Sequence, residues 1–145
     1  MEIYTIGFTK KTATQFFGSL RQANIKRLID VRLNNSSQLA GFTKKDDLSF
    51  FLAEICHIEY QHEPLLAPTQ DILGTYKKQK GSWSDYQQRF LALMRDRRVE
   101  ERINPKLFEI PTVLLCSEAT AEHCHRRLVL EYLQEKWENL NIIHI

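Results

Sequence analysis

The sequence has few of the features that mark specialised classes of protein. Its 145 residues include only three cysteines, four prolines and five glycines, and lysine plus arginine exceed aspartate plus glutamate by only 20 to 18. Three cysteines do not build the disulfide framework of a small secreted domain. A net charge of +2 excludes the strongly basic balance of a protein that coats nucleic acid. No run approaches the roughly 18 apolar residues of a membrane-spanning helix, so we expect no membrane partner.

The composition is typical of a globular protein. Hydrophobic residues make up 43% of the chain and charged residues 26%. A chain of this length buries roughly two thirds of the surface that its unfolded form exposes, so we expect a single domain over residues 1–145. The first residues lead into a strand-like pattern and not into a signal peptide, which predicts a cytoplasmic location where the cysteines stay reduced.

Apolar runs alternate with helical periodicities along the chain. They predict strands at residues 2–6, 27–32, 58–62, 112–116 and 141–145, and helices at residues 12–24, 43–55, 84–98 and 120–137. Capping signals mark three of the helix starts, namely Thr12 with Gln15, Thr43 with Asp46, and Ser84 with Gln87. We expect a polar loop at 33–37 and an irregular, mobile loop or lid at 63–82. The alternation favours a three-layer α/β sandwich with a mostly parallel sheet of about five strands.

Reactive side chains are concentrated near the end of the sequence. Two thiols, a carboxylate, an imidazole and two guanidiniums fall within twelve residues, as Cys116, Glu118, Cys124, His125, Arg126 and Arg127. The group follows the apolar run 113–115 and precedes a helical pattern, so we expect it where a buried strand meets a helix N-terminus. In open parallel sheets, ligands bind at that edge.

Other strand ends are expected at the same edge, because parallel strands all end on one side of a sheet. The first strand adds Thr5, Gly7 and Thr9, and the second adds Asp30 and Arg32. Arginine holds phosphate or carboxylate groups through paired N–H donors. We therefore predict that a small anionic ligand or a nucleic acid binds there. The predicted ligand-binding residues are Thr5, Gly7, Thr9, Arg32, Cys116 and Arg126.

Four residues are candidates for catalysis, namely Asp30, Glu118, Cys124 and His125. Asp30 or Glu118 would act as acid or base, and His125 as a proton carrier or second anion contact. Each carboxylate also has a structural interpretation. An aspartate at a strand end often caps a loop or pairs with an arginine, and Glu118 is equally suited to orient Arg126 or His125.

The cysteines leave two interpretations open. Cys116 ends an apolar strand, which is typical of core packing. Cys124 lies near a helix start beside a histidine and an arginine, where its thiolate is favoured. The spacing between the two matches neither a Cys-x-x-Cys redox motif nor a zinc ribbon. We assign no metal ligand and no cofactor.

Aromatic residues flank the basic part of segment 63–82. Tyr60, Tyr76, Trp83 and Tyr86 are interleaved with lysines such as Lys77. This pattern is typical of bases stacking beside phosphate-binding lysines. It is more typical of aromatic packing beneath a solvated, charged segment.

Three segments of the chain resemble the family called domain of unknown function 488. They are Tyr-Thr-Ile-Gly at 4–7, Leu-Ile-Asp-Val-Arg at 28–32, and Cys-Ser-Glu at 116–118 followed by Cys-His-Arg at 124–126. The resemblance covers essentially the whole chain and implies a Rossmann-like α/β domain. It marks as matching positions Thr5, Gly7, Asp30, Arg32, Cys116, Glu118, Cys124, His125 and Arg126. It brings no activity, and the chain departs from the family's usual pattern at 33–35, where a turn with serine and proline is more typical, and at 65–67.

Three functions remain open at this point. The first is an enzyme that hydrolyses or transfers a nucleotide, a nucleic-acid end or another phosphorylated compound. The second is a non-catalytic sensor or binding module that uses the same pocket. The third is a thiol-dependent redox protein in which Cys124 reacts and Cys116 resolves the intermediate.

Overall fold

Five strands form one sheet in the computed structural model, which describes residues 1–36 and 38–145. They are β1 (Glu2–Gly7), β2 (Arg27–Asp30), β3 (Glu59–His62), β4 (Thr112–Cys116) and β5 (Asn141–His144). Their order across the sheet is β3-β2-β4-β1-β5, and each neighbouring pair is parallel. The predicted α/β fold with a parallel, Rossmann-like sheet is confirmed. Ser37, in the predicted loop 33–37, lies outside the described residues.

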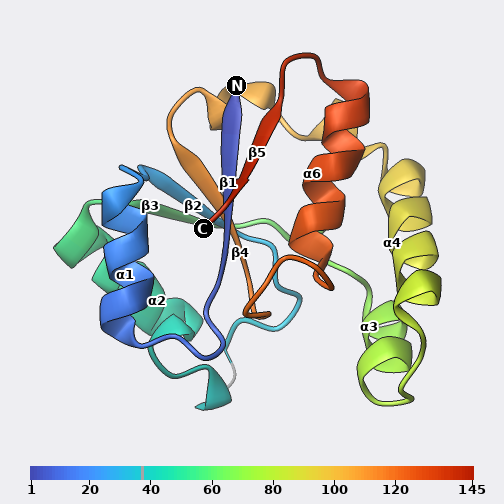
Figure 1. Cartoon of the computed structure of the whole chain (residues 1–145), viewed down its shortest axis with the longest axis horizontal. Helices are drawn as coiled ribbons and strands as arrows, with labels where there is room; N and C mark the ends of the chain where they lie inside the picture. Colours follow the sequence, from blue (N-terminus) through green and yellow to red (C-terminus); the bar gives the residue numbers. More distant parts are fainter. Residues whose placement is uncertain (37) are drawn as a thin grey trace.

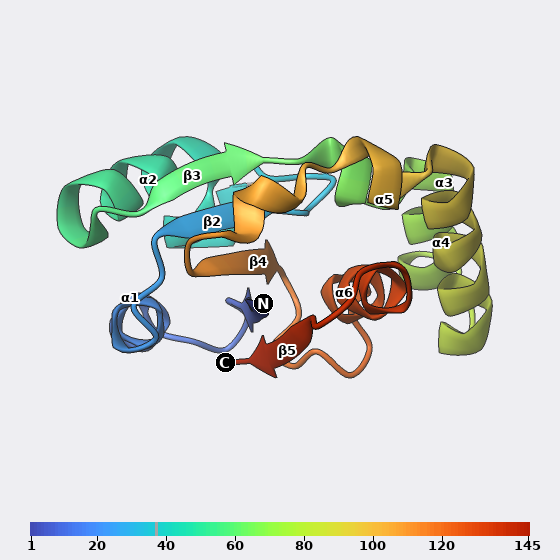
Figure 2. The same cartoon turned by 90° about the horizontal axis from the view of Figure 1, so that it is seen from above.

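Helices cover both faces of this sheet. They are α1 (Ala13–Gln22), α2 (Lys45–Phe51), α3 (Gln70–Lys77), α4 (Trp83–Arg97), α5 (Val99–Arg102) and α6 (His125–Lys136). Figures 1 and 2 show α1 and α2 on one side of the sheet, with α6, α4 and α3 on the other. Among the described residues, no helix is long and apolar enough to cross a lipid bilayer.

The central strand β4 is buried on both faces. All five of its residues are buried, as its uninterrupted apolar sequence predicts for a strand between two helical layers. Val113 and Leu115 pack with Phe16 and Leu48 on the side of α1 and α2. Leu114 and Cys116 belong to the second core, which includes side chains from α4 and α6.

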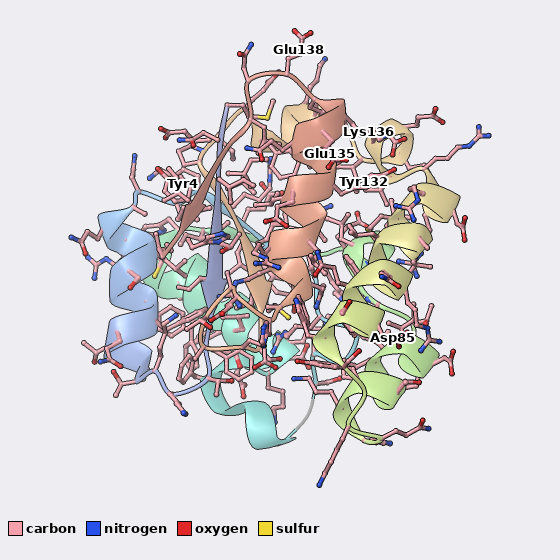
Figure 3. All side chains as sticks on the ribbon, turned by 45° about the vertical axis from the view of Figure 1, so that its right-hand side comes forward. Tyr4, Asp85, Tyr132, Glu135, Lys136 and Glu138 are labelled. Atoms are coloured by element: carbon pink, nitrogen blue, oxygen red, sulfur yellow. The ribbon has the colours of Figure 1, made fainter. Side chains whose placement is uncertain are left out.

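Tyr132, on the side of α6 nearest α4 in Figure 3, donates a hydrogen bond of 2.6 Å to Glu100 Oε2 in α5.

The strand order creates a crevice at the carboxyl edge of β4. From β1 and β2 the chain proceeds towards the β3 edge of the sheet, whereas from β4 it crosses to β5 at the opposite edge. The connections that leave the neighbouring strands β2 and β4 therefore run in opposite directions, and open α/β sheets bind ligands at such a point. The first turns of α4 and α6 lie at this edge, and Figure 3 shows Asp85 towards it and Glu138 at the opposite end of the molecule.

Segment 63–82 is more regular than the sequence suggests. Instead of a continuous irregular loop it contains a short 3-10 helix, Pro64–Leu66, and then α3. Thr69 caps α3 by accepting a hydrogen bond from the N–H of Ile72 at 3.3 Å. Arg97 in α4 donates to the carbonyl oxygens of Leu65 and Ala67, both at 2.7 Å. These hydrogen bonds from α4 hold the segment in an ordered conformation. The prolines and lysines of the segment do not indicate them, because the donor lies in a helix later in the chain.

Helix starts were predicted with mixed success. The capping box of Thr12 and Gln15 is present at the start of α1. In contrast, α2 begins after Lys44 with no hydrogen bond to a capping side chain. The N-cap of α4 is Ser82, two residues before the predicted cap Ser84, so the helix begins at Trp83. Helix α6 begins only at His125, because residues 117–123 form the loop that crosses the end of the sheet.

We expect the Thr12→Ala variant to have a free energy of unfolding about 1 kcal/mol lower, because the N-cap oxygen is lost. Thr14→Ala is the matched control, since Thr14 is exposed inside the same helix and alanine has the higher helix propensity. Urea denaturation measures both values. Equal stability of the two variants would contradict the capping assignment.

Candidate functional site

A cavity of about 170 Å³ lies at the carboxyl edge of the sheet. Its walls come from the loop after β2, from α3 and α4, and from the end of β4 with the loop and first turn of α6 that follow. Five of the residues proposed from the sequence line it, namely Arg32, Cys116, Glu118, Cys124 and His125. The residues Thr5, Gly7, Thr9, Asp30 and Arg126 lie around the cavity and do not line it.

Asp30 and Arg32 form a buried ion pair. Arg32 donates through Nε to one carboxylate oxygen and through Nη2 to the other, both at 2.9 Å. Nη2 also donates to the carbonyl of Thr43 at 2.7 Å. Asp30 is fully buried and Arg32 is 3% exposed. This bidentate geometry holds the end of β2 rigidly and engages the guanidinium within the chain.

Tyr60 in β3 completes the surroundings of this carboxylate. Its hydroxyl donates to Asp30 Oδ2 at 2.6 Å, and burial followed by that bond raises the pKa of Tyr60. His62 Nε2 hydrogen-bonds the carbonyl of Arg32 at 2.9 Å. We noted Tyr60 in the sequence only as an aromatic residue beside a basic segment. Only the pairing of β2 with β3 reveals its role at Asp30.

Two thiols and an imidazole meet at the floor of the cavity. The Sγ atoms of Cys116 and Cys124 and a ring nitrogen of His125 lie within 4.8 Å of one another. Cys116 ends β4, Cys124 is the N-cap of α6, and His125 is the first residue of that helix. Sulfur and imidazole nitrogen are donors that transition metals bind, so these residues have the chemistry of either a reactive thiol or a metal ligand set.

The two thiols differ in acidity. Burial alone raises the pKa of Cys124, but hydrogen bonds from Cys116 and His125 and the charges of His125 and Arg126 outweigh it and hold that pKa well below its usual value. The hydrogen bond to Cys124, together with burial, raises the pKa of Cys116 well above its usual value. Cys124 is therefore the more acidic thiol of the pair.

Arg126 is a buried cation without an acidic partner. It is 1% exposed, and among the described residues no carboxylate oxygen lies within 4.0 Å of it. Its Nη1 donates to the carbonyl of Glu118 at 2.8 Å, and its Nε to Thr5 Oγ1 at 3.3 Å. Its charge, second to burial, lowers the pKa of Lys11 and that of His144. This end of the sheet therefore carries surplus positive charge.

The end of β1 supports the loop that follows β4. Thr9 donates to the carbonyl of Ser117 through its backbone N–H at 3.1 Å and through its hydroxyl at 2.6 Å. Gly7 packs directly against the same loop, since a Cβ atom there would lie 1.6 Å from the carbonyl oxygen of Glu118. The contacts of Thr9 and Gly7 in the structure are thus with the loop and not with the cavity.

Lys77 and Glu118 form an ion pair at the side of the cavity. Their side chains are 48% and 39% exposed. Burial lowers the pKa of Lys77, but the hydrogen bond to Glu118 and its charge raise it overall. The sequence placed Lys77 in a solvated loop. Its role depends on α3, which brings it to a carboxylate 41 residues away in the chain.

Aromatic rings form one wall of the cavity. Tyr76, Tyr86 and His123 line it, and the Trp83 ring packs against all three. The Trp83 ring stacks on His123 at 5.0 Å and on Tyr86 at 5.3 Å between ring centroids. Sequence reasoning gave His123 no role, because nothing local indicates that its loop meets the start of α4. The rings pack against one another, and those that line the cavity give it one aromatic side.

The Asp30→Asn variant is expected to lose about 3–5 kcal/mol of unfolding free energy, because it leaves the buried guanidinium of Arg32 without its counter-charge. Asp71→Asn is the control, since it breaks the exposed ion pair with Arg89 and should cost under about 1 kcal/mol. Chemical denaturation followed by circular dichroism measures both. A loss at Asp30 as small as that at Asp71 would refute the rigid ion pair.

Gly7→Ala tests the contact between the end of β1 and the loop after β4. We expect it to lower the unfolding free energy by about 1–3 kcal/mol, because the new methyl group overlaps the carbonyl of Glu118. Gly18→Ala should instead raise stability by about 0.5–1 kcal/mol, since that glycine is in α1 with open space around it. Thermal unfolding of both variants checks the opposite signs, and a stabilised Gly7→Ala protein would contradict the contact.

Comparisons with known proteins give one positive result. The sequence model of the family described as "Domain of unknown function DUF488" matches residues 12–133, which hold α1 to α5 and most of α6. Searches of curated proteins and of solved structures found no match. The matched region covers most of the chain and includes Asp30, Arg32 and the whole segment from Cys116 to Arg126. This chain therefore belongs to the DUF488 family.

Proposed function

We propose that the protein binds a small anionic molecule with a flat ring, such as a nucleotide, in the cavity at the carboxyl edge of β2 and β4. One observation carries this proposal. The buried guanidinium of Arg126, which has no acidic partner among the described residues, adjoins the thiol floor of a cavity with an aromatic wall. Surplus positive charge beside an aromatic wall favours a ligand that combines an anion with a ring.

The preference for an anion follows from the charge at the start of α6. Arg126 is in the first turn of this helix, where the helix dipole adds partial positive charge. The side chain of the N-cap residue Cys124 makes no capping hydrogen bond to the backbone. The charge of Arg126 favours the thiolate of Cys124, and the same field favours any other anion in the cavity.

The preference for a ring follows from the aromatic wall. Tyr86 is almost fully buried, and its ring is fixed between Trp83 at 5.3 Å and Phe90 at 6.1 Å. His123 is held by its stacking on Trp83. These rings are in place before a ligand arrives, so little conformational freedom is lost when a planar group packs against them.

The size of the cavity limits the ligand. At about 170 Å³ the cavity is smaller than the roughly 300–1,000 Å³ of drug-sized ligand pockets. Part of a mononucleotide fits inside, with the rest at the mouth of the cavity, and a nucleic acid would reach it only with a single terminal residue. Glu118 and His125 line the cavity and are the groups available for acid or base chemistry on such a ligand. Asp30 is less available, because Arg32 and Tyr60 occupy its oxygens.

Isothermal titration calorimetry with adenosine monophosphate, adenosine and inorganic phosphate tests the proposal. We expect the nucleotide to bind most tightly, because it alone offers both the ring and the anion. Lys77→Ala should weaken nucleotide binding at least about tenfold, since it removes a cation and leaves Glu118 as an unpaired negative charge. Lys78→Ala is the control, because Lys78 is the exposed next residue and does not line the cavity.

Two results would overturn the proposal: no binding of any of the three probes to the unmodified protein, or equal affinity of the Lys77 and Lys78 variants for the nucleotide. The titrations use protein treated with a chelator, so that they report on the chain alone. Chromatography of the nucleotide after long incubation with the protein then distinguishes a binding module from an enzyme. Unaltered nucleotide supports a binding module, and released phosphate or base supports an enzyme.

A further inference from the structure

We propose that Cys116, Cys124 and His125 bind a zinc ion at the floor of the cavity, with the fourth coordination position open to the cavity. The proposal concerns a different chemical capacity of the same region and does not require the anionic ligand proposed above. It rests on the placement of three donor atoms, on the hydrogen bond that orients the histidine, and on the balance of charge.

The distances between the donor atoms fit a tetrahedral zinc site. Bonds of about 2.3 Å to sulfur and about 2.0–2.1 Å to nitrogen place tetrahedral S and N donors about 3.6 Å apart, and two S donors about 3.8 Å apart. In the structure, Cys116 Sγ lies 3.5 Å from His125 Nδ1. All three donors lie within 4.8 Å of one another. Shifts of less than about 1 Å in the side chains would therefore complete the geometry.

The hydrogen bond of His125 prepares its ring for a metal. His125 Nε2 lies 2.7 Å from the carbonyl oxygen of Val31. A carbonyl oxygen only accepts hydrogen bonds, so Nε2 carries a hydrogen and Nδ1 is the ring nitrogen left to bind a metal. Nδ1 is also the nitrogen nearer to Cys116 Sγ, 3.5 Å away against 3.8 Å for Nε2. Metal-binding histidines are usually oriented by this kind of bond to a carbonyl or carboxylate.

The charge of the site also suits a divalent cation. When the metal binds, both thiols give up their protons, and two thiolates neutralise Zn²⁺, so the buried cluster adds no net charge beside Arg126. Within residues 1–36 and 38–145 this is the only group of three or more side chains with donor atoms close enough to hold a metal. Soft thiolate and imidazole donors in a tetrahedral arrangement select zinc over magnesium or calcium.

The open position follows from the number of ligands. Structural zinc sites use four protein ligands, whereas sites with three keep a water molecule or a substrate in the fourth position. The three donors all line the cavity, so that position faces the space inside it. The sequence concealed this set, because cysteines eight residues apart and a histidine directly after the second one match no usual zinc spacing.

Elemental analysis of the full-length protein tests the inference. The protein is incubated with zinc under reducing conditions, dialysed, and analysed by inductively coupled plasma mass spectrometry. We expect about one zinc ion per chain, and a loss of most of it in each of Cys116→Ser, Cys124→Ser and His125→Ala. Cys56→Ser is the control, because Cys56 is the remaining cysteine and lies outside the cavity. It should retain the zinc.

A second measurement needs no variant and so does not depend on whether the variants fold. Cobalt(II) added to the reduced, metal-free protein should give the intense visible bands of a tetrahedral site and a sulfur-to-cobalt charge-transfer band in the near ultraviolet. Three results would overturn the inference: zinc content near zero in the unmodified protein, equal zinc loss in Cys56→Ser, or cobalt spectra without a thiolate band. A disulfide between Cys116 and Cys124 in protein kept under reductant would also overturn it, in favour of redox chemistry.

Discussion

The burial of Arg126 is the constraint on which the carboxyl edge of the sheet depends. From the first turn of α6 its guanidinium reaches Thr5 in β1 and the carbonyl of Glu118 in the loop after β4. One side chain thus fixes a strand, a loop and a helix relative to one another. Because it has no acidic partner among the described residues, it also sets the electrostatic character of the region. The low pKa of Cys124 partly reflects that charge.

The ion pair of Asp30 and Arg32 has a structural role at the edge of the cavity, because its polar groups bind one another and not a ligand. Both oxygens of Asp30 accept hydrogen bonds from Arg32, and Tyr60 adds a third partner from the neighbouring strand. A pair enclosed in this way forms a rigid boundary to the cavity. The groups that remain accessible are those of the loop and helix after β4, together with Lys77 and the aromatic wall.

The ligand and the metal proposed here draw on different parts of one cavity. The metal needs only the sulfur and nitrogen donors of its floor, whereas the ligand needs the aromatic wall, Lys77 and the field of Arg126. If both are present, an anionic group of the ligand would lie next to the open coordination position of the zinc. Membership of the DUF488 family is compatible with either proposal, because the matched region contains every residue that lines the cavity.

The sequence by itself determined the elements whose signals are local. The continuous apolar run of β4 predicted a strand buried on both faces, and Thr12 with Gln15 predicted the start of α1. Strand ends carrying polar residues correctly pointed to one edge of the sheet. Only the tertiary structure decided which of those residues face the cavity, that Arg32 is engaged by Asp30, and that α3 brings Lys77 to Glu118. Periodicity and capping depend on neighbours within a few residues, whereas the partner of a charged group depends on strand order and on packing between segments distant in the chain.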